Sequence, residues 1–296
     1  MSRLGISIVA LFSKDAALRL AAQYGAQEVV AGLLRSGADI NAGALHSAAL
    51  RSDPAMVECL ISHGANVNRA DKRGCCPLHF ATYGMNPGTV GTLLDAAALP
   101  NSKNAKGWTS VHIAAIGNEK TLREVLPRIS SPSCINEMPR ERRKSDPRFL
   151  AIAEKLLAHG ADVRLATDCG DTPLHLACRW AFSDLVLLFV KHGADVNAKN
   201  QLGEFPLLWL SLLGDTELSK FLIERGADAN ASTTREATAL HVAALHGHVQ
   251  MVMLLVENGA NLQATAKGPQ GTVSALDLAR AGGHERIVAF LRDRGG

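Results

Sequence analysis

A four-residue motif ending in histidine returns along this chain at a fixed interval, and this interval restricts the fold more than any other feature. Its complete form is Thr-Pro-Leu-His at residues 172–175, and degraded forms end at His79, His112 and His241. His46, His79 and His112 follow one another at intervals of 33, and the positions of His175 and His241 differ by 66, which is twice that period. A fixed period of this length is typical of stacked repeats rather than of a globular domain.

A second motif keeps the same period. The glycines of Gly-Ala-Asp or Gly-Ala-Asn recur at the interval of the histidines, at Gly160, Gly193, Gly226 and Gly259. Threonine at a helix N-cap accepts a hydrogen bond from an unpaired N–H, and proline at the next position has no N–H to leave unpaired. Glycine ends a helix in the left-handed region at the least cost. Each period therefore predicts two short antiparallel helices, followed by a turn-rich stretch that we interpret as a hairpin.

On these motifs the chain resembles the ankyrin repeat family over residues 15–296. The resemblance implies an all-α fold, a solenoid of about eight helix-turn-helix repeats with projecting β-hairpin fingers. We expect residues 1–14 to form an N-terminal apolar cap segment. The two motifs place the repeats at about 15–41, 42–68, 69–101, 102–164 with an insertion at 119–148, 165–197, 198–230, 231–263 and 264–296.

Three repeats depart from the period. Six residues are missing between Gly37 and Gly64, so we expect no finger there. In the third repeat, Pro87 and Gly88 open the second helix and Ala97 replaces the terminal glycine, which predicts a short or frayed helix. The fourth repeat is nearly twice as long as the period, and long insertions in compact arrays are usually functional or disordered.

Composition excludes several classes of protein. The formal net charge of +3 is too small for a surface-wide nucleic-acid field. Six scattered cysteines form no framework spacing, which favours reduced thiols and hence a cytoplasmic or nuclear setting. The apolar run 4–12 is too short to span a membrane and lacks a clear cleavage pattern, so secretion is disfavoured.

The sequence carries none of the motifs that identify a nucleophile elbow, a phosphate-binding loop or a zinc protease. His175 and Cys178 share one helix face, but two ligands do not make a zinc site, so we assign no metal. Because the other motif histidines recur in phase with the repeats, we interpret them as structural. We therefore expect no enzyme activity, no cofactor and no small-molecule substrate; an enzyme with an unrecognised site is the weakest alternative.

In ankyrin-like repeats the residues that end the first helix tend to face the concave groove. Aromatic and arginine side chains in such a groove are typical of binding hot spots. The alternative is that the apolar members simply pack on neighbouring helices. Trp108, which precedes the motif threonine, is expected to project from the base of a finger. The predicted partner-binding residues are Tyr24, Arg51, Tyr83, Trp108, Ile116, Arg179, Trp180, Leu213 and His246.

The insertion holds a basic cluster. Between residues 139 and 148 there are five basic and two acidic residues, an excess equal to that of the whole chain. Arg142-Arg143-Lys144-Ser145 resembles a kinase site that prefers basic sequences, and phosphate on Ser145 would offset the local positive charge. A solvated loop is the plain alternative. The basic residues concerned are Arg140, Arg142, Arg143, Lys144 and Arg148.

These observations predict a monomeric scaffold or adaptor that binds a partner polypeptide through the concave groove and the hairpin tips. The main alternative is that the basic insertion, residues 139–148, recruits an acidic partner, nucleic acid or an anionic membrane. The small overall charge argues against nucleic acid and membrane. The same solenoid can present different surfaces to unrelated targets, so the partner's identity does not follow from the sequence.

Overall fold

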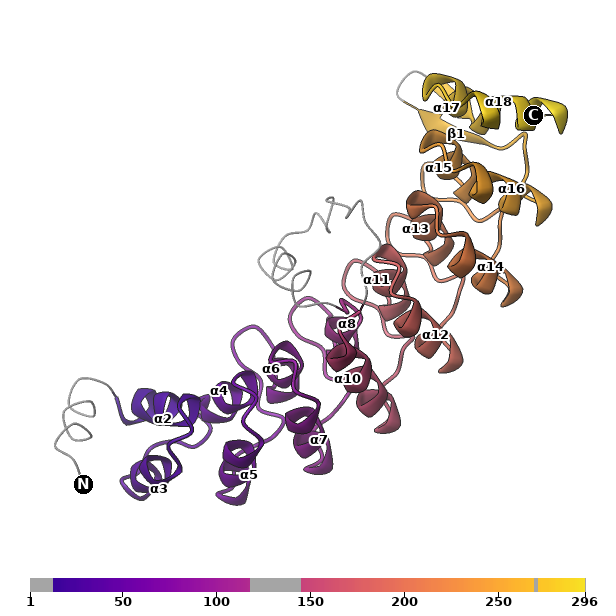
Figure 1. Ribbon diagram of the computed structural model, residues 1–296. Helices are drawn as coiled ribbons and strands as arrows, with labels where there is room; N and C mark the ends of the chain where they lie inside the picture. Colours follow the sequence, from indigo (N-terminus) through magenta and orange to yellow (C-terminus); the bar gives the residue numbers. More distant parts are fainter. Residues whose placement is uncertain (1–12, 118–144, 269–270, 296) are drawn as a thin grey trace. The chain divides into compact units, whose positions relative to one another are not determined.

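The computed structural model describes residues 13–117, 145–268 and 271–295. They fall into two compact units: residues 13–117 with 146–162 form the N-terminal unit, and Ser145 with the described residues from 163 onward forms the C-terminal unit (Figure 1). The greater part of the predicted cap segment, residues 1–12, lies outside the described residues, and so do residues 119–144 of the insertion. The predicted repeat boundaries stay predictions.

The N-terminal unit is built from helix pairs. Its first helices, α2, α4, α6 and α8, pack one against the next, and α5, α7 and α10 form a second layer. The helices are α2 (Lys14–Gln23), α3 (Gln27–Arg35), α4 (Ala44–Leu50), α5 (Pro54–Ser62), α6 (Pro77–Tyr83), α7 (Pro87–Asp95), α8 (Ser110–Ala114) and α10 (Pro147–Ala158).

The C-terminal unit repeats this arrangement. Helices α11, α13, α15 and α17 pack in one row, and α14, α16 and α18 pack in a second. The elements are α11 (Pro173–Arg179), α12 (Ser183–Lys191), α13 (Pro206–Leu213), α14 (Thr216–Glu224), α15 (Ala239–Leu245), α16 (Val249–Glu257), β1 (Thr265–Gly268), β2 (Gly271–Ser274), α17 (Ala275–Ala281) and α18 (Glu285–Asp293).

First helices such as α8 and α11 are buried on all sides, whereas second helices such as α10 bury one apolar stripe. In α10, Phe149, Ile152 and Leu156 are fully buried and lie at helical spacing. Small residues keep the first helices close together: Ala48 and Ala49 of α4 are fully buried. Since a single helix pair exposes its apolar stripe, the stacked array rather than the repeat is the stable unit.

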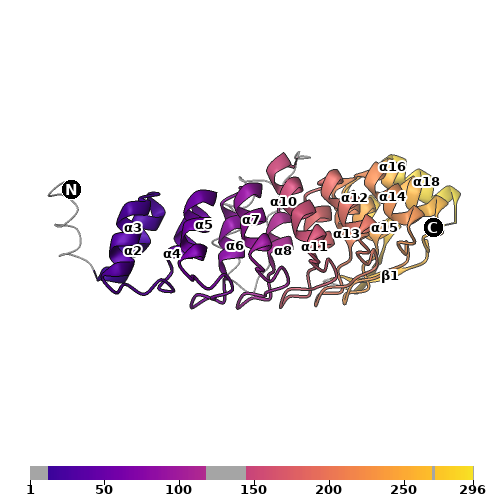
Figure 2. The same cartoon turned by 90° about the horizontal axis from the view of Figure 1, so that it is seen from below.

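The loops before the first helices project to one side of each unit, as Figure 2 shows. We call such a loop a finger. Neighbouring fingers meet through their backbones: Thr234 N–H donates to the Leu202 carbonyl at 3.0 Å. A Cβ on Gly203, whose φ is +72°, would lie 2.7 Å from the Thr234 nitrogen. Glycine is therefore required there both for its conformation and for the close approach of the next finger.

The last finger of the chain forms a regular antiparallel hairpin, in which Thr265 pairs with Ser274 and Gly268 with Gly271. The finger before it has an isolated bridge between Ser232 and Thr238. The connection between α3 and α4 is six residues shorter than the one between α5 and α6, as the missing residues there require.

The expectation that the second helix of the third repeat is short or frayed is wrong. Helix α7 spans nine residues, as do α3 and α5. Pro87 occupies the first turn, where its missing N–H costs nothing, and the Asn86 side chain caps the helix by accepting from the Gly88 and Thr89 N–H groups. Ala97 adopts a φ of +64°, so it takes the left-handed conformation that glycine takes in other repeats.

We predict that Gly203→Ala lowers the free energy of unfolding more than Gly226→Ala does. Both glycines have positive φ, but a Cβ on Gly226 meets nothing within 4 Å. Gly226→Ala should therefore cost about 1–2 kcal/mol through its left-handed backbone alone, and Gly203→Ala should cost more. Urea denaturation of the two variants measures this. Equal losses would show that the approach of the fingers contributes nothing.

Candidate partner-binding surface

The motif histidines join neighbouring repeats. In the N-terminal unit, His46 Nε2 lies 3.1 Å from the Cys75 carbonyl and His79 Nε2 lies 3.0 Å from the Trp108 carbonyl. In the C-terminal unit, His175 Nε2 lies 3.1 Å from the Glu204 carbonyl. Each bond runs from a first helix to the finger of the following repeat. We call this contact the histidine bridge.

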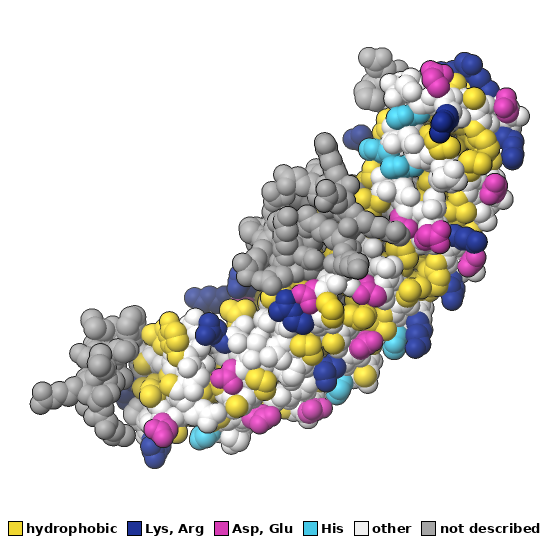
Figure 3. Space-filling model, viewed as in Figure 1, with side chains coloured by type: hydrophobic (Ala, Val, Ile, Leu, Met, Phe, Trp, Pro, Cys, Tyr) yellow, Lys and Arg dark blue, Asp and Glu magenta, His cyan; other side chains and the backbone are white. Residues whose placement is uncertain are grey.

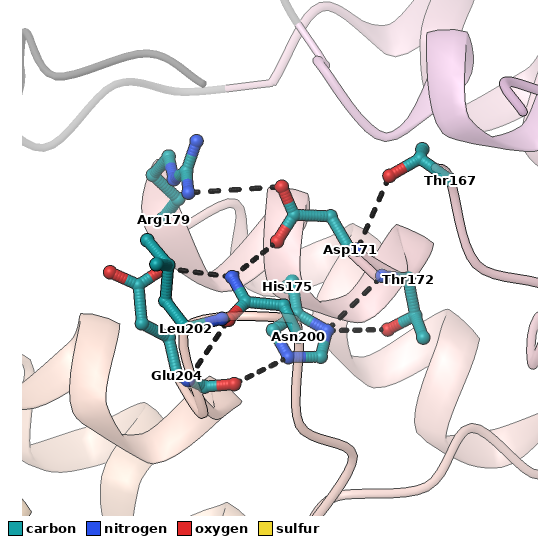
Figure 4. A network of polar contacts seen from close by, with 8 residues as sticks. All are labelled: Thr167, Asp171, Thr172, His175, Arg179, Asn200, Leu202 and Glu204. Carbon is teal, nitrogen blue, oxygen red and sulfur yellow. Dashed lines mark hydrogen bonds and ion pairs between the residues drawn. The ribbon is translucent and has the colours of Figure 1, made fainter. Parts of the chain in front are cut away.

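The other nitrogen of the ring caps the helix to which it belongs. The Thr172 N–H donates to His175 Nδ1 at 3.2 Å, and the Thr172 hydroxyl lies 2.8 Å from the same atom (Figure 4). Because Nδ1 accepts, the proton of the neutral ring sits on Nε2, where it donates to the bridge. The hydroxyls of Thr109 and Thr238 likewise lie 2.8 Å from Nδ1 of His112 and His241. These contacts make the motif histidines structural.

Burial favours the neutral form of two bridge histidines, His46 and His175, and of the capping residue His241. The pKa of His175 is lowered by its burial, which outweighs the nearby Asp171 carboxylate and the bond to Glu204. Burial also lowers the pKa values of His46 and His241. A neutral ring is what the arrangement needs, because an imidazolium has no acceptor nitrogen for the N-cap N–H.

Cys76 stands where the other repeats have threonine. Its Sγ lies 3.0 Å from His79 Nδ1, and its own N–H donates to the same nitrogen at 3.2 Å. Burial by itself would raise the pKa of the Cys76 thiol, but the contact with His79 outweighs it and holds this pKa below its ordinary value. Both side chains are buried, so the pair replaces a capping threonine within the core.

A second link between repeats was missed by the sequence reasoning. Asn197 Oδ1 accepts from the Asp228 N–H at 2.8 Å and its Nδ2 donates to the Gly226 carbonyl at 2.8 Å. Asn230 makes the same pair of bonds to Asn261 and Gly259. The signal was present as a period: asparagine recurs at the interval of the histidines, at 68 and 101 in the N-terminal unit and at 197 and 230 in the C-terminal unit.

Several of the predicted partner-binding residues are accessible. In the N-terminal unit, Tyr24 ends α2 and is 74% exposed, and Arg51 is exposed at the end of α4 beside Leu50, which is 47% exposed. In the C-terminal unit, His246 is exposed at the end of α15, next to Leu245, which is 44% exposed. We call these five side chains the helix-end surface of their respective units.

Other predicted residues are less accessible. Tyr83 and Leu213 are half-buried. Ile116, Arg179 and Trp180 are each at most 3% exposed, so their part in partner binding stays a prediction. Contrary to our expectation, Trp108 does not project from its finger; its large apolar ring is buried and lies 5.9 Å from the ring of His112.

Arg179 has an unusual environment for a charged side chain. Its guanidinium lies 4.0 Å from the ring centre of Trp209. Its Nη2 is 3.9 Å from the Asp171 carboxylate (Figure 4). Its Nε and Nη1 atoms are buried without a hydrogen-bond partner. The Asp171 carboxylate also accepts from Asn200 Nδ2 at 2.9 Å, which ties the cluster to the next finger.

Two residues of the predicted basic insertion can be placed. The Ser145 hydroxyl donates to the Asp184 carboxylate within the C-terminal unit. Arg148 pairs with Asp146 at 2.6 Å at the start of α10, which lowers the pKa of the Asp146 carboxyl. Phosphorylation of Ser145 stays a prediction. The remaining basic residues, Arg140, Arg142, Arg143 and Lys144, lie outside the described residues.

Over the described ranges, His, Cys, Asp and Glu side chains form no group of three or more that could hold a metal ion.

Among those same residues, no helix combines the length and apolar character that crossing a bilayer requires.

Comparison with known proteins identifies the family. The family model "Ankyrin repeats (3 copies)" matches residues 18–104, 45–136, 148–233 and 207–296. The chain belongs to the ankyrin repeat family. A crystal structure of the human ASB11 ankyrin repeat domain has the same fold, with a TM-score of 0.63 at 24% identity over 83% of this chain and 96% of that one.

Curated relatives share part of the array. The human ankyrin repeat and SOCS box protein 16 is 30% identical over 195 residues, which is 60% of this chain and 43% of the relative. The transient receptor potential channel pyrexia of Drosophila melanogaster is 32% identical over 157 residues, which is 51% of this chain and 16% of the channel. The chain thus spans less than half the length of either relative.

We predict that the chain loses stability as the pH falls from 7.5 to 5.5. The folded pKa values of His46, His175 and His241 lie below the ordinary value of 6.5, so the unfolded state binds more protons below that pH. The slope is about 1.4 kcal/mol per pH unit for each full proton of difference. The loss should begin near pH 6.5 and continue towards the lowered folded values, and urea denaturation at several pH values measures it.

His79 opposes this trend, because the Cys76 thiol raises the pKa of its ring against the effect of burial. The measurement stays above pH 5.5 so that aspartate and glutamate side chains, whose ordinary pKa values are about 4, remain ionised throughout. Stability that is constant or increases from pH 7.5 to 5.5 would contradict the account of neutral, bridging histidines.

Proposed function

We propose that this chain is a non-enzymatic scaffold or adaptor that binds a partner polypeptide through the helix-end surface and the finger tips. Ankyrin repeats generally mediate protein–protein interactions, and this chain belongs to that family. The observation that carries the proposal is the exposure of Tyr24 and Leu50 at the C-terminal ends of the packed helices α2 and α4. Tyrosine is one of the side chains that dominate binding hot spots.

The relatives support a binding role for the array itself. Their names describe a channel, a SOCS box protein and a nuclear factor NF-kappa-B p105 subunit, and the residues matched here cover only 16%, 43% and 15% of those chains. A segment common to proteins with such different names supports a shared binding role rather than a shared activity.

The C-terminal unit offers a matched pair of leucines for the test. Leu245 ends the first helix of its repeat, whereas Leu187 lies on the second helix α12, and both are 44% exposed. Truncating either one removes the same apolar area, so a difference in binding reports position rather than hydrophobicity.

We predict that Leu245→Ala weakens binding of peptides selected from a random displayed library on the full chain, and that Tyr24→Ala does so for peptides that dock on the N-terminal unit. Loss of a contact worth about 1–2 kcal/mol weakens affinity roughly fivefold to thirtyfold. Leu187→Ala should change it less than twofold. Calorimetric titration of the selected peptides measures this. Binding that survives both test substitutions, or falls equally with Leu187→Ala, would contradict the proposal.

A further inference from the structure

Two neighbouring fingers of the N-terminal unit carry an excess of positive charge. They comprise residues 69–74, before α6, and residues 102–107, before α8. These loops contain a single acidic residue, Asp71. Four of their basic side chains, all on exposed residues, form what we call the basic finger edge: Arg69, Lys72, Arg73 and Lys106. Figure 3 shows basic side chains projecting from this edge, over the loop that precedes α6.

The lone carboxylate is occupied in building its own turn. Asp71 Oδ1 accepts from the N–H groups of Arg73 and Cys75, each at 2.8 Å. Its other oxygen is 3.6 Å from Arg73 Nε, yet the Arg73 side chain remains 76% exposed. An exposed pair at this distance neutralises little of the arginine's charge in water. Asp71 therefore shapes the finger without cancelling its positive field.

The two fingers are held against each other. The Ala105 N–H donates to the Arg73 carbonyl at 2.9 Å, and a Cβ on Gly74 would lie 2.9 Å from the Ala105 nitrogen. Charges on loops in backbone contact lie within reach of the screening length of about 8 Å at physiological salt. Their potentials add, so the edge presents one positive surface rather than separate lysines.

This charge is not a general property of the fingers. Over the equivalent residues of the C-terminal unit, the finger before α11 (165–170) carries Asp168 and no basic residue, and the finger before α13 (198–203) carries Lys199 alone. In the last two fingers Lys267 pairs with Glu236 at 2.7 Å, which leaves Arg235 as their other basic residue. The positive edge is thus confined to the two fingers of the N-terminal unit.

We propose that the basic finger edge docks an acidic peptide segment of the partner, one rich in Asp and Glu. The proposal rests on the proposed function and specifies the chemistry of the partner at this place. Single-stranded nucleic acid is the less suitable ligand, because neither finger has an aromatic residue on which bases could stack, and the nearby Trp108 is buried. Carboxylates need only flexible cations, which lysine supplies as mobile point charges.

The test uses the full chain and a fluorescent oligoglutamate of about ten residues, with oligoglutamine of the same length as the neutral control. Binding is followed by fluorescence anisotropy at about 0.05 M salt, where exposed charges are least screened. Lys72→Glu/Arg73→Glu/Lys106→Glu should weaken oligoglutamate binding about tenfold or more, because three attractive charges are replaced by repulsive ones. Wild-type binding should weaken steeply with added salt, and the variant's should not.

A control variant makes the same change of net charge elsewhere. Lys191→Glu/Lys220→Glu/Arg286→Glu alters three exposed residues on second helices of the C-terminal unit, and it should change affinity less than threefold. Equal loss in both variants would overturn the proposal, because bulk charge would then explain the binding. Circular dichroism on each variant confirms that it is folded.

Two rival sites have their own outcomes. If Arg142→Glu/Arg143→Glu/Lys144→Glu abolishes oligoglutamate binding while the finger variant does not, the insertion is the acidic-partner site and the proposal is wrong. If oligothymidylate binds the finger edge more tightly than oligoglutamate does, the ligand is nucleic acid and the proposal is also wrong. Library peptides that depend on Tyr24 or Leu245 would still support the proposed function, so the two can fail separately.

Discussion

The hydrogen bond from a buried histidine to the carbonyl of the next finger is the contact that joins neighbouring repeats at His46, His79 and His175. It leaves from the first helix of one repeat and ends on the backbone of the following one, as His79 and Trp108 show at 3.0 Å. A buried acceptor left unpaired costs about 1–3 kcal/mol. A finger that moved away from the histidine would pay this cost, so the bond holds the finger in position. The remaining nitrogen of the same ring caps the helix, which couples the local fold of a repeat to its stacking.

This coupling explains why the motif combines threonine with histidine. Threonine supplies both an N–H and a hydroxyl to Nδ1, and Cys76 reproduces the arrangement with a thiol. His46 keeps the bridge to Cys75, but Gly43 stands at its N-cap and its Nδ1 has no partner. His241 shows the reverse case, because it keeps the contact of Nδ1 with Thr238 while its Nε2 is buried without a hydrogen-bond partner. The bridge and the cap can therefore each persist without the other.

The period of the sequence predicted the fold because it reflects backbone geometry, which repeats. It predicted less of the surface, because exposure depends on which neighbours cover a side chain. Tyr24 and Trp180 occupy equivalent positions, at the ends of α2 and α11, yet the first is exposed and the second buried. The prediction that Trp108 projects from its finger was wrong for the same reason. The nine-residue α7 shows the reverse error: Pro87 and Ala97 disfavour a helix on average, but the Asn86 cap and a tolerated left-handed backbone sustain it.

The asparagine links and the basic finger edge were both visible in the sequence, one as a period and the other as a local run of charge. Neither could be interpreted without the structure. The role of the asparagines is seen only in their hydrogen bonds to the backbone of the next repeat. The basic residues form one edge only because the hydrogen bond between Arg73 and Ala105 holds their two loops together. The proposed recognition surface is thus determined by the side chains that a regular backbone leaves exposed.

The most direct measurement of this account is hydrogen–deuterium exchange on the full chain, with and without a peptide selected for binding. The account predicts slower exchange in the peptide's presence at the ends of the first helices or in the fingers, in the unit where the peptide docks. Exchange in the second helices of that unit should be unchanged. Protection confined to the second helices would contradict the central claim that the helix ends and the finger tips form the recognition surface.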